Sequence, residues 1–371
     1  MSSKLSSVKD IEMFLNGVCI LGTGGGGKLD YGRRFLYPLA EAGTLNWGSV
    51  DEIGDDENVA CVWYMGSVAP IPPKGKPEIE KIKESCMVRA VRLFMQETGV
   101  TVHRLVAMEM GASNTAAAVE TGALMNLPVL DGDLAGRAVP EIVQVTPFFH
   151  GVRLDPFAVC DEWGNTVFVR RAVTGEMAEM IGKMISVVTK SPDSSTLCGN
   201  CGILMKGSEA KKYLVRGTLT KAFELGKAIQ AAKEAGESLL ETAVNQLHAV
   251  PLFQGVIEKI DWESKSGYMY GQNTIRGAGK WNGKKCEIWY KNENHMLWMD
   301  GKLRCSSPDS ICGIYTKTGV ATNNPTLKEG DEVSYFGVPN PEFRKPESLG
   351  YFSPEHFGFK EKYRPVEELA D

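Results

Sequence analysis

A run of four glycines is the first candidate site. Residues 21–28 read Leu-Gly-Thr-Gly-Gly-Gly-Gly-Lys, after an apolar segment, 17–21, that we expect to be a strand. Consecutive glycines cost backbone entropy and suit a loop that closely approaches a ligand. Their amides can cradle an anion. The predicted substrate-binding residues are Thr23, Gly24, Gly25, Gly26 and Gly27; a tight structural turn is the alternative.

The glycine run does not match the common nucleotide-binding motifs. No Lys-Ser or Lys-Thr pair stands at the P-loop spacing, and no acidic residue follows on a second strand as in dinucleotide-binding folds. We therefore expect no nucleotide cofactor.

A second candidate site is residues 108–114, Met-Glu-Met-Gly-Ala-Ser-Asn, which follow an expected strand. Glu109 at a strand end could act as a general base or a metal ligand. Asn114 is predicted to face the same pocket and bind substrate. The alternative for Asn114 is capping of the following helix, a common role of asparagine.

The third candidate is the acidic run 130–141, which carries Asp131, Asp133, Arg137 and Glu141. Carboxylates this close repel one another unless they share a proton, a cation or an arginine. We predict catalytic roles for Asp131, Asp133 and Arg137 and a substrate contact for Glu141. A salt-bridged turn is the structural alternative, and Asp133 could instead cap a helix that starts at Leu134.

Cysteine and histidine spacing gives no strong metal signature. Cys198 and Cys201 form a lone CxxC, whereas a closed zinc site needs four ligands. Cys305 and Cys312 do not supply a good second pair. The five histidines show no HxH or HExxH spacing. We interpret most of these side chains as structural.

The surrounding pattern predicts an α/β domain followed by β structure. Expected strands at 58–65, 104–109 and 127–130 alternate with expected helices at 77–99 and 113–125. Such alternation is typical of a mostly parallel sheet, in which ligands lie beyond the carboxyl ends of the strands. All three candidate runs follow such ends.

The second half has two expected helices and then several strands. The helix at 175–188 places Met177, Met180, Ile181, Met184 and Ile185 on one face, which is ordinary core spacing. A second helix is expected at 219–235, and strands at 252–260, 267–275, 285–290, 295–298 and 331–336. We divide the chain into an α/β domain, 1–165, and a β-rich domain, 166–371.

Charge and hydropathy exclude some classes of partner. The 371-residue chain has a net charge of −5 and short basic clusters only, which argues against nucleic acid or an anionic membrane as a partner. No apolar stretch approaches the roughly 20 residues of a spanning helix, and residues 1–10 do not form a signal peptide. We expect a cytoplasmic protein.

Taken together, these motifs resemble the S-methyl thiohydantoin desulfurase family. The glycine loop and the run Asp-Gly-Asp-x-x-Gly-Arg-Ala-x-Pro-Glu carry most of the resemblance, which extends from about residue 11 to 359. Residues 215–218, 291–294, 307–312, 318–319 and 357–359 resemble the closing pattern of the family. The resemblance implies an α/β domain, a β-rich domain and hydrolytic removal of sulfur from a five-membered cyclic amide. The CxxC is not a general feature of the family and leaves the substrate open.

The resemblance suggests a mechanism. Glu109, Asp131 or Asp133 would activate water, with a divalent metal, zinc or another, as a candidate cofactor at Asp131 and Asp133. Amides of the glycine run would stabilise negative charge on the ring, and Arg137 or Asn114 would orient a carbonyl. Asn292 and Asp309 would close the cleft from the second domain.

Two other classes of function remain open at this point. The chain could be a non-catalytic ligand-binding or accessory subunit of a hydantoinase-like complex, or it could be an enzyme that uses ATP. The expected partners are a small cyclic amide and further copies of the chain in a homo-oligomer.

Overall fold

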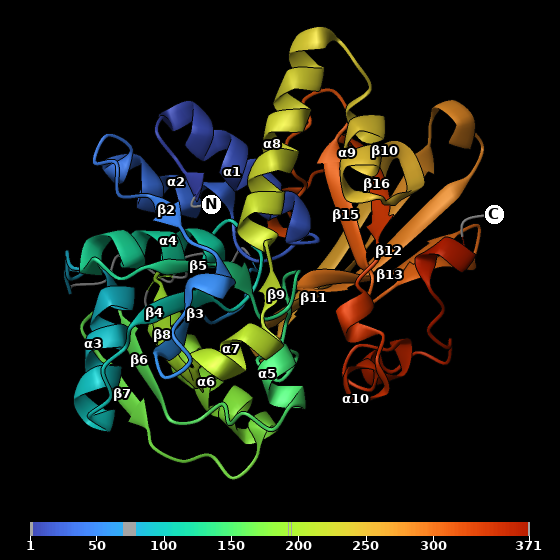
Figure 1. Cartoon of the computed structure of the whole chain (residues 1–371). Helices are drawn as coiled ribbons and strands as arrows, with labels where there is room; N and C mark the ends of the chain where they lie inside the picture. The colour runs from blue at the N-terminus through green and yellow to red at the C-terminus, as the bar shows by residue number, and fades with distance from the viewer. Residues whose placement is uncertain (1–2, 70–78, 192, 194, 370–371) are drawn as a thin grey trace.

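The computed structural model describes residues 3–69, 79–191, 193 and 195–369. Figure 1 shows two units side by side, an N-terminal α/β domain and a C-terminal domain built on a second sheet. This architecture confirms the predicted fold class.

The N-terminal sheet has the strand order β7-β6-β8-β3-β4-β5-β9. Its parallel part is formed by β3 (Asn58–Tyr64), β4 (Arg104–Ala107) and β5 (Val129–Asp133). Antiparallel strands extend it on both sides: β6 (Phe157–Asp161), β7 (Thr166–Val169), β8 (Cys198–Lys206) and β9 (Val215–Arg216). The predicted division after residue 165 therefore does not separate the two sheets, because β7, β8 and β9 belong to the first one.

Both faces of this sheet are buried. Along β3, Ala60 and Val62 belong to one apolar cluster, while Val59, Cys61 and Trp63 belong to another. This alternation is the period of two expected of a strand covered on both sides. Helices α1 (Val8–Leu21), α2 (Leu29–Leu36), α3 (Cys86–Thr98), α4 (Asn114–Met125) and α8 (Thr218–Ala235) pack on the first face. Helices α5 (Thr146–Phe149), α6 (Gly175–Lys190) and α7 (Gly207–Tyr213) lie at the second.

The expected strand at 17–21 is wrong, because these residues form the last part of helix α1. The Ser7 side chain accepts a hydrogen bond from the amide of Asp10 and caps the start of the helix. A short apolar run cannot by itself distinguish a buried strand from a buried helix. The glycine loop therefore connects two helices, α1 and α2.

The C-terminal sheet is antiparallel, in the order β14-β13-β12-β11-β10-β16-β15. Its strands are β10 (Val250–Lys265), β11 (Tyr268–Gly277), β12 (Lys285–Lys291), β13 (Glu293–Met299), β14 (Lys302–Ser306), β15 (Ser310–Tyr315) and β16 (Glu332–Val338). Helix α9 (Leu239–Leu247) packs against β16, and short helical turns, including α10 (Pro346–Leu349), follow the last strand.

Helix α6 has its polar side turned inward. Its buried residues include Glu179, Lys183 and Ser186. Four residues of the expected apolar core face, Met177, Met180, Ile181 and Met184, are exposed instead. The prediction of ordinary core spacing is therefore wrong, because this helix directs its polar side chains into a cavity.

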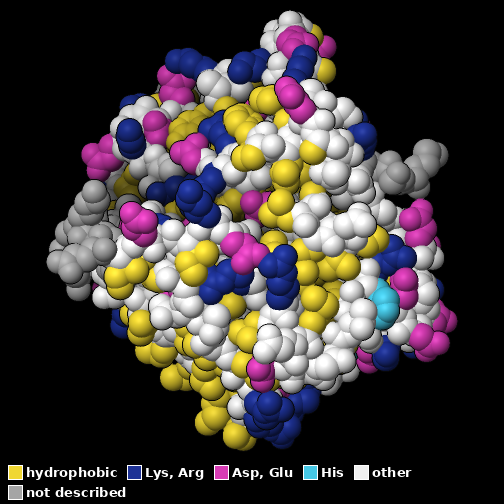
Figure 2. All heavy atoms as spheres, turned by 90° about the vertical axis from the view of Figure 1, so that its left-hand side faces the viewer, with side chains coloured by type: hydrophobic (Ala, Val, Ile, Leu, Met, Phe, Trp, Pro, Cys, Tyr) yellow, Lys and Arg dark blue, Asp and Glu magenta, His cyan; other side chains and the backbone are white. Residues whose placement is uncertain are grey.

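Charges are mixed over the surface of the protein. Figure 2 shows lysine, arginine and acidic side chains interspersed on one face, without a broad area of a single sign. Among the described residues, no helix combines the length and the apolar character needed to cross a membrane.

Candidate active site

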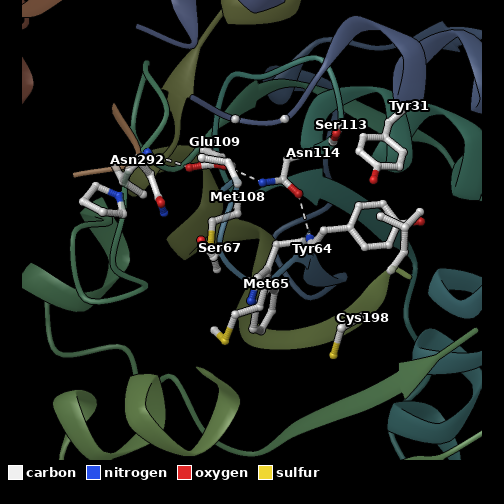
Figure 3. Close-up of a pocket in the computed structure, with 18 of the residues that line it drawn as sticks. Tyr31, Tyr64, Met65, Ser67, Met108, Glu109, Ser113, Asn114, Cys198 and Asn292 are labelled. Atoms are coloured by element: carbon white, nitrogen blue, oxygen red, sulfur yellow. Dashed lines mark hydrogen bonds between the residues drawn. The ribbon is translucent and has the colours of Figure 1, made fainter. Parts of the chain in front are cut away.

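A cavity of about 180 Å³ lies between the glycine loop, the end of β3, the turn after β4 and helix α6. Figure 3 shows its side chains. The volume exceeds the roughly 10–15 Å³ that one water molecule needs, so the cavity has room for a small ligand. The C-terminal domain closes part of its wall with Asn292 and Glu293. The cavity therefore lies at the junction of the two domains.

Glu109 is a buried carboxyl on the cavity wall. One oxygen accepts a 2.6 Å hydrogen bond from the amide of Val139, and the other accepts from the Asn114 side chain. Burial raises the pKa of Glu109 to about 7, although both hydrogen bonds favour the ionised form. A carboxyl with this pKa can exchange protons near neutral pH.

Asn114 holds Glu109 in place. Its Oδ1 accepts a 2.7 Å hydrogen bond from the amide of Tyr64, and its Nδ2 donates to Glu109, as Figure 3 shows. Helix α4 begins at Asn114 without a side-chain cap. The capping alternative is therefore not what the structure shows, because the amide group connects the end of β3 to the carboxyl after β4.

Glu293 brings a second buried carboxyl from the other domain. Its Oε1 lies 3.2 Å from the amide nitrogen of Gly26, which donates the hydrogen bond. Its Oε2 is buried and has no hydrogen-bond partner among the described residues. Burial and the charge of Glu109 raise the pKa of Glu293 to about 8. Because the two buried carboxyls repel each other in this way, one of them is protonated and the other ionised near neutral pH.

Three lysines also line the cavity, Lys28, Lys183 and Lys190. Lys183 has a partner, because its Nζ lies 3.6 Å from the carboxylate of Glu179. Glu179 is fixed in turn by the amide of Ile142 and the hydroxyl of Tyr268, each at 2.7 Å. Lys183 lowers the pKa of both Glu109 and Glu293, so it favours the ionised form of the carboxyl pair.

The glycine loop reaches the cavity only at its end. Gly26 and Gly27 line the wall, whereas Thr23, Gly24 and Gly25 do not. Thr23 bonds through its hydroxyl to the backbone of Ile311, and Gly24 pairs with Asn323, both in the C-terminal domain. A Cβ on Gly25 would lie 1.9 Å from Oε1 of Glu293. The glycines therefore let the loop pass close to the second domain.

The structure places Asp131 and Asp133 away from this cavity. The Asp131 carboxylate accepts hydrogen bonds from the amide and the hydroxyl of Thr220, at 3.0 and 2.6 Å, in the first turn of helix α8. The buried Asp133 carboxyl accepts from the amides of Ala135 and Gly136 in a turn, so it does not cap a helix at Leu134. Burial raises the pKa of Asp133 to about 7. Neither aspartate joins Glu109 on the cavity wall, although the charge of Glu109 contributes to the raised pKa of Asp133.

The predicted metal ligands do not fit a divalent cation. Among the described residues, no three His, Cys, Asp or Glu side chains group so that they could hold a metal ion. Asp131 is engaged by Thr220 and Asp133 by its own turn. Calcium and magnesium require six or more oxygen ligands and zinc usually four in all, so we derive no step through a metal at these aspartates.

Arg137 joins the domains and does not line the cavity. Its fully buried guanidinium donates to the carbonyl oxygens of Asn294, Pro308 and Asp309, and to that of Ala138. Burial lowers its pKa. These contacts place Arg137 in the interface between the two domains.

The remaining predicted residues lie at different places. Asn292 lines the cavity, and its Oδ1 accepts from the amide of Met269. Glu141 pairs with Lys291 and His356, which lower its pKa to about 2 despite burial. Asp309 is bound by the guanidinium of Arg344 and the hydroxyl of Tyr363. Of these three, only Asn292 belongs to the wall.

Cys198 lines the far part of the cavity, below Tyr64 in Figure 3. Burial raises its pKa to about 12, so it is a neutral thiol near pH 7 and a poor nucleophile. Cys201 is also a buried free thiol.

Sequence reasoning missed Glu293 and the lysines. Glu293 lies within the run Asn-Glu-Asn, which we singled out only as a closing segment. A charged residue at the start of a buried strand was the one available signal. Lys183 and Lys190 were hidden in a helix whose methionines suggested a core face.

The protein thus combines an α/β domain with a second domain built on an antiparallel sheet. A pair of buried carboxyls lines the cavity where the two domains meet. The S-Me-THD-like N-terminal domain model matches residues 9–171, and the S-Me-THD-like C-terminal domain model matches residues 176–366. The chain belongs to the S-Me-THD-like family, which confirms the resemblance to S-methyl thiohydantoin desulfurases.

Structural comparison supports the fold. The crystal structure of a protein from Chromobacterium violaceum is similar to this chain with a TM-score of 0.76 and 22% identity, over 99% of this chain and 100% of that one. No curated protein matches the chain.

Proposed function

We propose that this protein is a hydrolase that acts on a five-membered cyclic amide, an S-methyl thiohydantoin or a hydantoin-like ring. The observation that carries the proposal is the pair Glu109 and Glu293, two buried carboxyls with raised pKa values on one cavity. Such a pair supplies a general base and a general acid at the same pH. Membership of the S-Me-THD-like family supports the choice of ring.

The proposed reaction proceeds in two steps. Water attacks the ring carbon that bears the S-methyl group, the electrons of the C=N bond move to the ring nitrogen, and the ionised carboxyl of the pair accepts one proton of the water. The nitrogen electron pair then re-forms the C=N bond as the carbon–sulfur bond breaks, and a protonated carboxyl gives its proton to the departing methanethiolate. The remaining hydroxyl proton moves to the ring nitrogen, which gives the carbonyl of the hydantoin. The products are methanethiol and the hydantoin, and the pair ends with the one proton with which it started.

Neighbouring groups support these steps. Asn114 holds Glu109 through its side-chain amide, so the carboxyl faces the cavity in one orientation. The positive charge of Lys183 stabilises the ionised member of the pair. The backbone of Gly27 lies on the wall where negative charge would develop on the ring, whereas the amide of Gly26 already donates to Glu293.

The proposal includes a homo-oligomer in the cytoplasm, with a small cyclic amide as its partner. The two alternatives, an accessory subunit of a hydantoinase-like complex and an ATP-using enzyme, make different predictions. The first gives ring binding without turnover, and the second gives stabilisation by ATP but not by hydantoins.

The test uses the purified chain and S-methyl thiohydantoins in water enriched in oxygen-18. We expect release of methanethiol, measured with a thiol reagent, and one labelled oxygen in the hydantoin, measured by mass spectrometry. Glu109→Gln should lower the rate of both signals by about 10²–10⁴. Natural turnover in this variant, or a ring that binds and is never converted, would refute the proposed hydrolase.

A further inference from the structure

Lys28 and Lys190 are two lysines on the cavity wall for which the described residues supply no acidic partner. Lys28 follows the glycine loop, and Lys190 ends helix α6, so they come from distant parts of the sequence. Among the described residues, neither side chain forms an ion pair within 4 Å, whereas Lys183 on the same wall is matched by Glu179. On this wall, the positive charge that no described carboxylate balances therefore belongs to these two lysines.

The position of Lys190 is fixed by one hydrogen bond. Its Nζ donates to the carbonyl oxygen of Ser67 at 3.0 Å. An ammonium group has three N–H donors, and the described residues accept from one of them, so two can bind a ligand. Burial, and to a lesser extent the nearby charges of Lys183 and Lys28, lower the pKa of Lys190 to about 8.

Unpaired positive charges in a partly enclosed cavity are energetically unfavourable unless an anion binds beside them. A surface lysine avoids this cost by extending into water, but Lys190 is held at the cavity by Ser67. A bound carboxylate would accept hydrogen bonds from both ammonium groups. Glu109 and Glu293 line the same cavity as the two lysines.

We propose that Lys28 and Lys190 form a subsite for an anionic substituent, and that the substrate ring carries a carboxylate. This inference rests on the proposed function only for the identity of the ring. The carboxyl pair acts on the ring, and the two lysines select rings with an acidic side chain over neutral ones.

Binding calorimetry with hydantoin-5-acetate and 5-ethylhydantoin tests the subsite. We expect the acidic ligand to bind about 10-fold more tightly or better, and Lys190→Gln and Lys28→Gln each to remove about 10-fold of its affinity. Binding of 5-ethylhydantoin should not change. Lys233→Gln, at an exposed lysine of helix α8, is the matched control.

The outcomes separate the subsite from the reaction. Equal binding of the two ligands, no binding of either, or an undiminished preference in both lysine variants would overturn the subsite. A preference for the acidic ligand that depends on the lysines supports the subsite even if no S-methyl thiohydantoin is converted. Turnover of acidic and neutral thiohydantoins at equal kcat/KM would support the hydrolase and refute the subsite.

The outer face of helix α6 carries a second, independent inference. From Met177 to Val188, every exposed residue of the helix is apolar. These residues are between 38% and 68% exposed: Met177, Met180, Ile181, Met184, Val187 and Val188. A surface helix normally directs its apolar side to the core. The outward apolar side of helix α6 therefore indicates that another surface packs against it.

We infer that a second copy of the chain covers this face. With Val173 beside it, the face joins seven exposed apolar side chains, and a contiguous exposed apolar patch of this kind marks a protein–protein interaction site. A face made only of Met, Ile and Val needs no charged complement and can pack against itself. The commonest arrangement of identical chains, a two-fold dimer, brings equal surfaces together.

Sedimentation analysis at micromolar concentration tests the dimer. We expect twice the mass of one chain for the natural protein and for Leu124→Glu, a control at an exposed apolar residue of helix α4. The double variant Met180→Glu, Met184→Glu should sediment as a monomer with unchanged circular dichroism. A monomeric natural protein, or a double variant that remains dimeric, would contradict this interface.

Discussion

The amide of Gly26 donates a hydrogen bond to the carboxyl of Glu293 at 3.2 Å and so connects the glycine loop to the C-terminal sheet. The other oxygen of Glu293 has no described partner. One hydrogen bond thus fixes the carboxyl in position while leaving an oxygen able to bind or release a proton. Because Glu109 lies on the same wall, the catalytic proposal depends on this contact between domains.

The first prediction concerns the carboxyl pair. Glu109→Gln and Glu293→Gln should each lower kcat/KM for the thiohydantoin by about 10²–10⁴, because general acid and general base contributions have this size. The folded state should survive, since glutamine keeps the shape and an acceptor oxygen. Steady-state kinetics and thermal unfolding measure both effects.

Glu120→Gln is the matched control for these variants. Burial also raises the pKa of Glu120 to about 7, but this residue is not on the cavity wall. Its variant should keep activity within about threefold. If Glu120→Gln lost as much activity as Glu109→Gln, the raised pKa alone would not identify the catalytic groups.

The pH dependence of activity follows from the same pair. Catalysis requires one ionised and one protonated carboxyl, with pKa values raised by burial to about 7 for Glu109 and about 8 for Glu293. We expect kcat/KM to rise through the lower value, to fall through the higher one and to peak between them. A profile that is flat from about pH 6 to about pH 9 would exclude this acid–base pair.

Parts of the site could be predicted from the sequence because they follow local patterns. Buried strands at 58–64 and 104–107 were recognisable as apolar runs, and Glu109 lies two residues beyond the end of the second. Gly26 and Glu109 line one cavity, but the glycine loop follows helix α1 and not the strand that we expected.

Other parts could not be predicted, because they depend on contacts between distant segments. Glu293 meets Gly26 across 267 residues of sequence, and no local pattern encodes this pairing. Asp131 and Asp133 looked catalytic because carboxylates cluster there, but Asp131 instead binds Thr220. The apolar residues of helix α6 have the usual helical spacing, but the polar side of the helix is the one that is buried. Periodicity reveals a face, and the protein around it decides which face is inside.

The stability of the protein should fall as the pH rises. Glu293 has an ordinary pKa of 4.5 and a folded pKa raised to about 8. Between these values the folded protein keeps a proton that the unfolded chain releases, so stability is full below the lower value and is lost toward the higher one. Urea unfolding from about pH 5 to about pH 8 should show this slope, and Glu293→Gln should make it shallower. An equal slope in the variant would contradict the raised pKa.

Arg137 should prove structural. Arg137→Met leaves the carbonyl oxygens of Asn294, Pro308 and Asp309 without this donor, which should cost about 2–4 kcal/mol of unfolding free energy. Arg137→Lys should restore part of that loss, because it keeps the charge but not the planar fork. The folded fraction of either variant should retain kcat/KM within about threefold. A variant of natural stability with little activity would instead place Arg137 at the substrate.

Gly25 should be intolerant of a side chain for reasons of space. Its backbone does not have a positive φ, so alanine there causes no conformational strain, but the Cβ would lie 1.9 Å from Oε1 of Glu293. Gly25→Ala must displace Glu293 or the loop, and overpacking of this kind costs about 1–3 kcal/mol. We expect a lower unfolding temperature and at least about a 10-fold loss of kcat/KM, because Glu293 leaves its position beside Gly26. Gly350→Ala, where nothing lies within 4 Å of the added Cβ, should change neither quantity. A Gly25→Ala protein with natural activity would show that the reaction does not require Glu293 to stay where the glycine loop holds it.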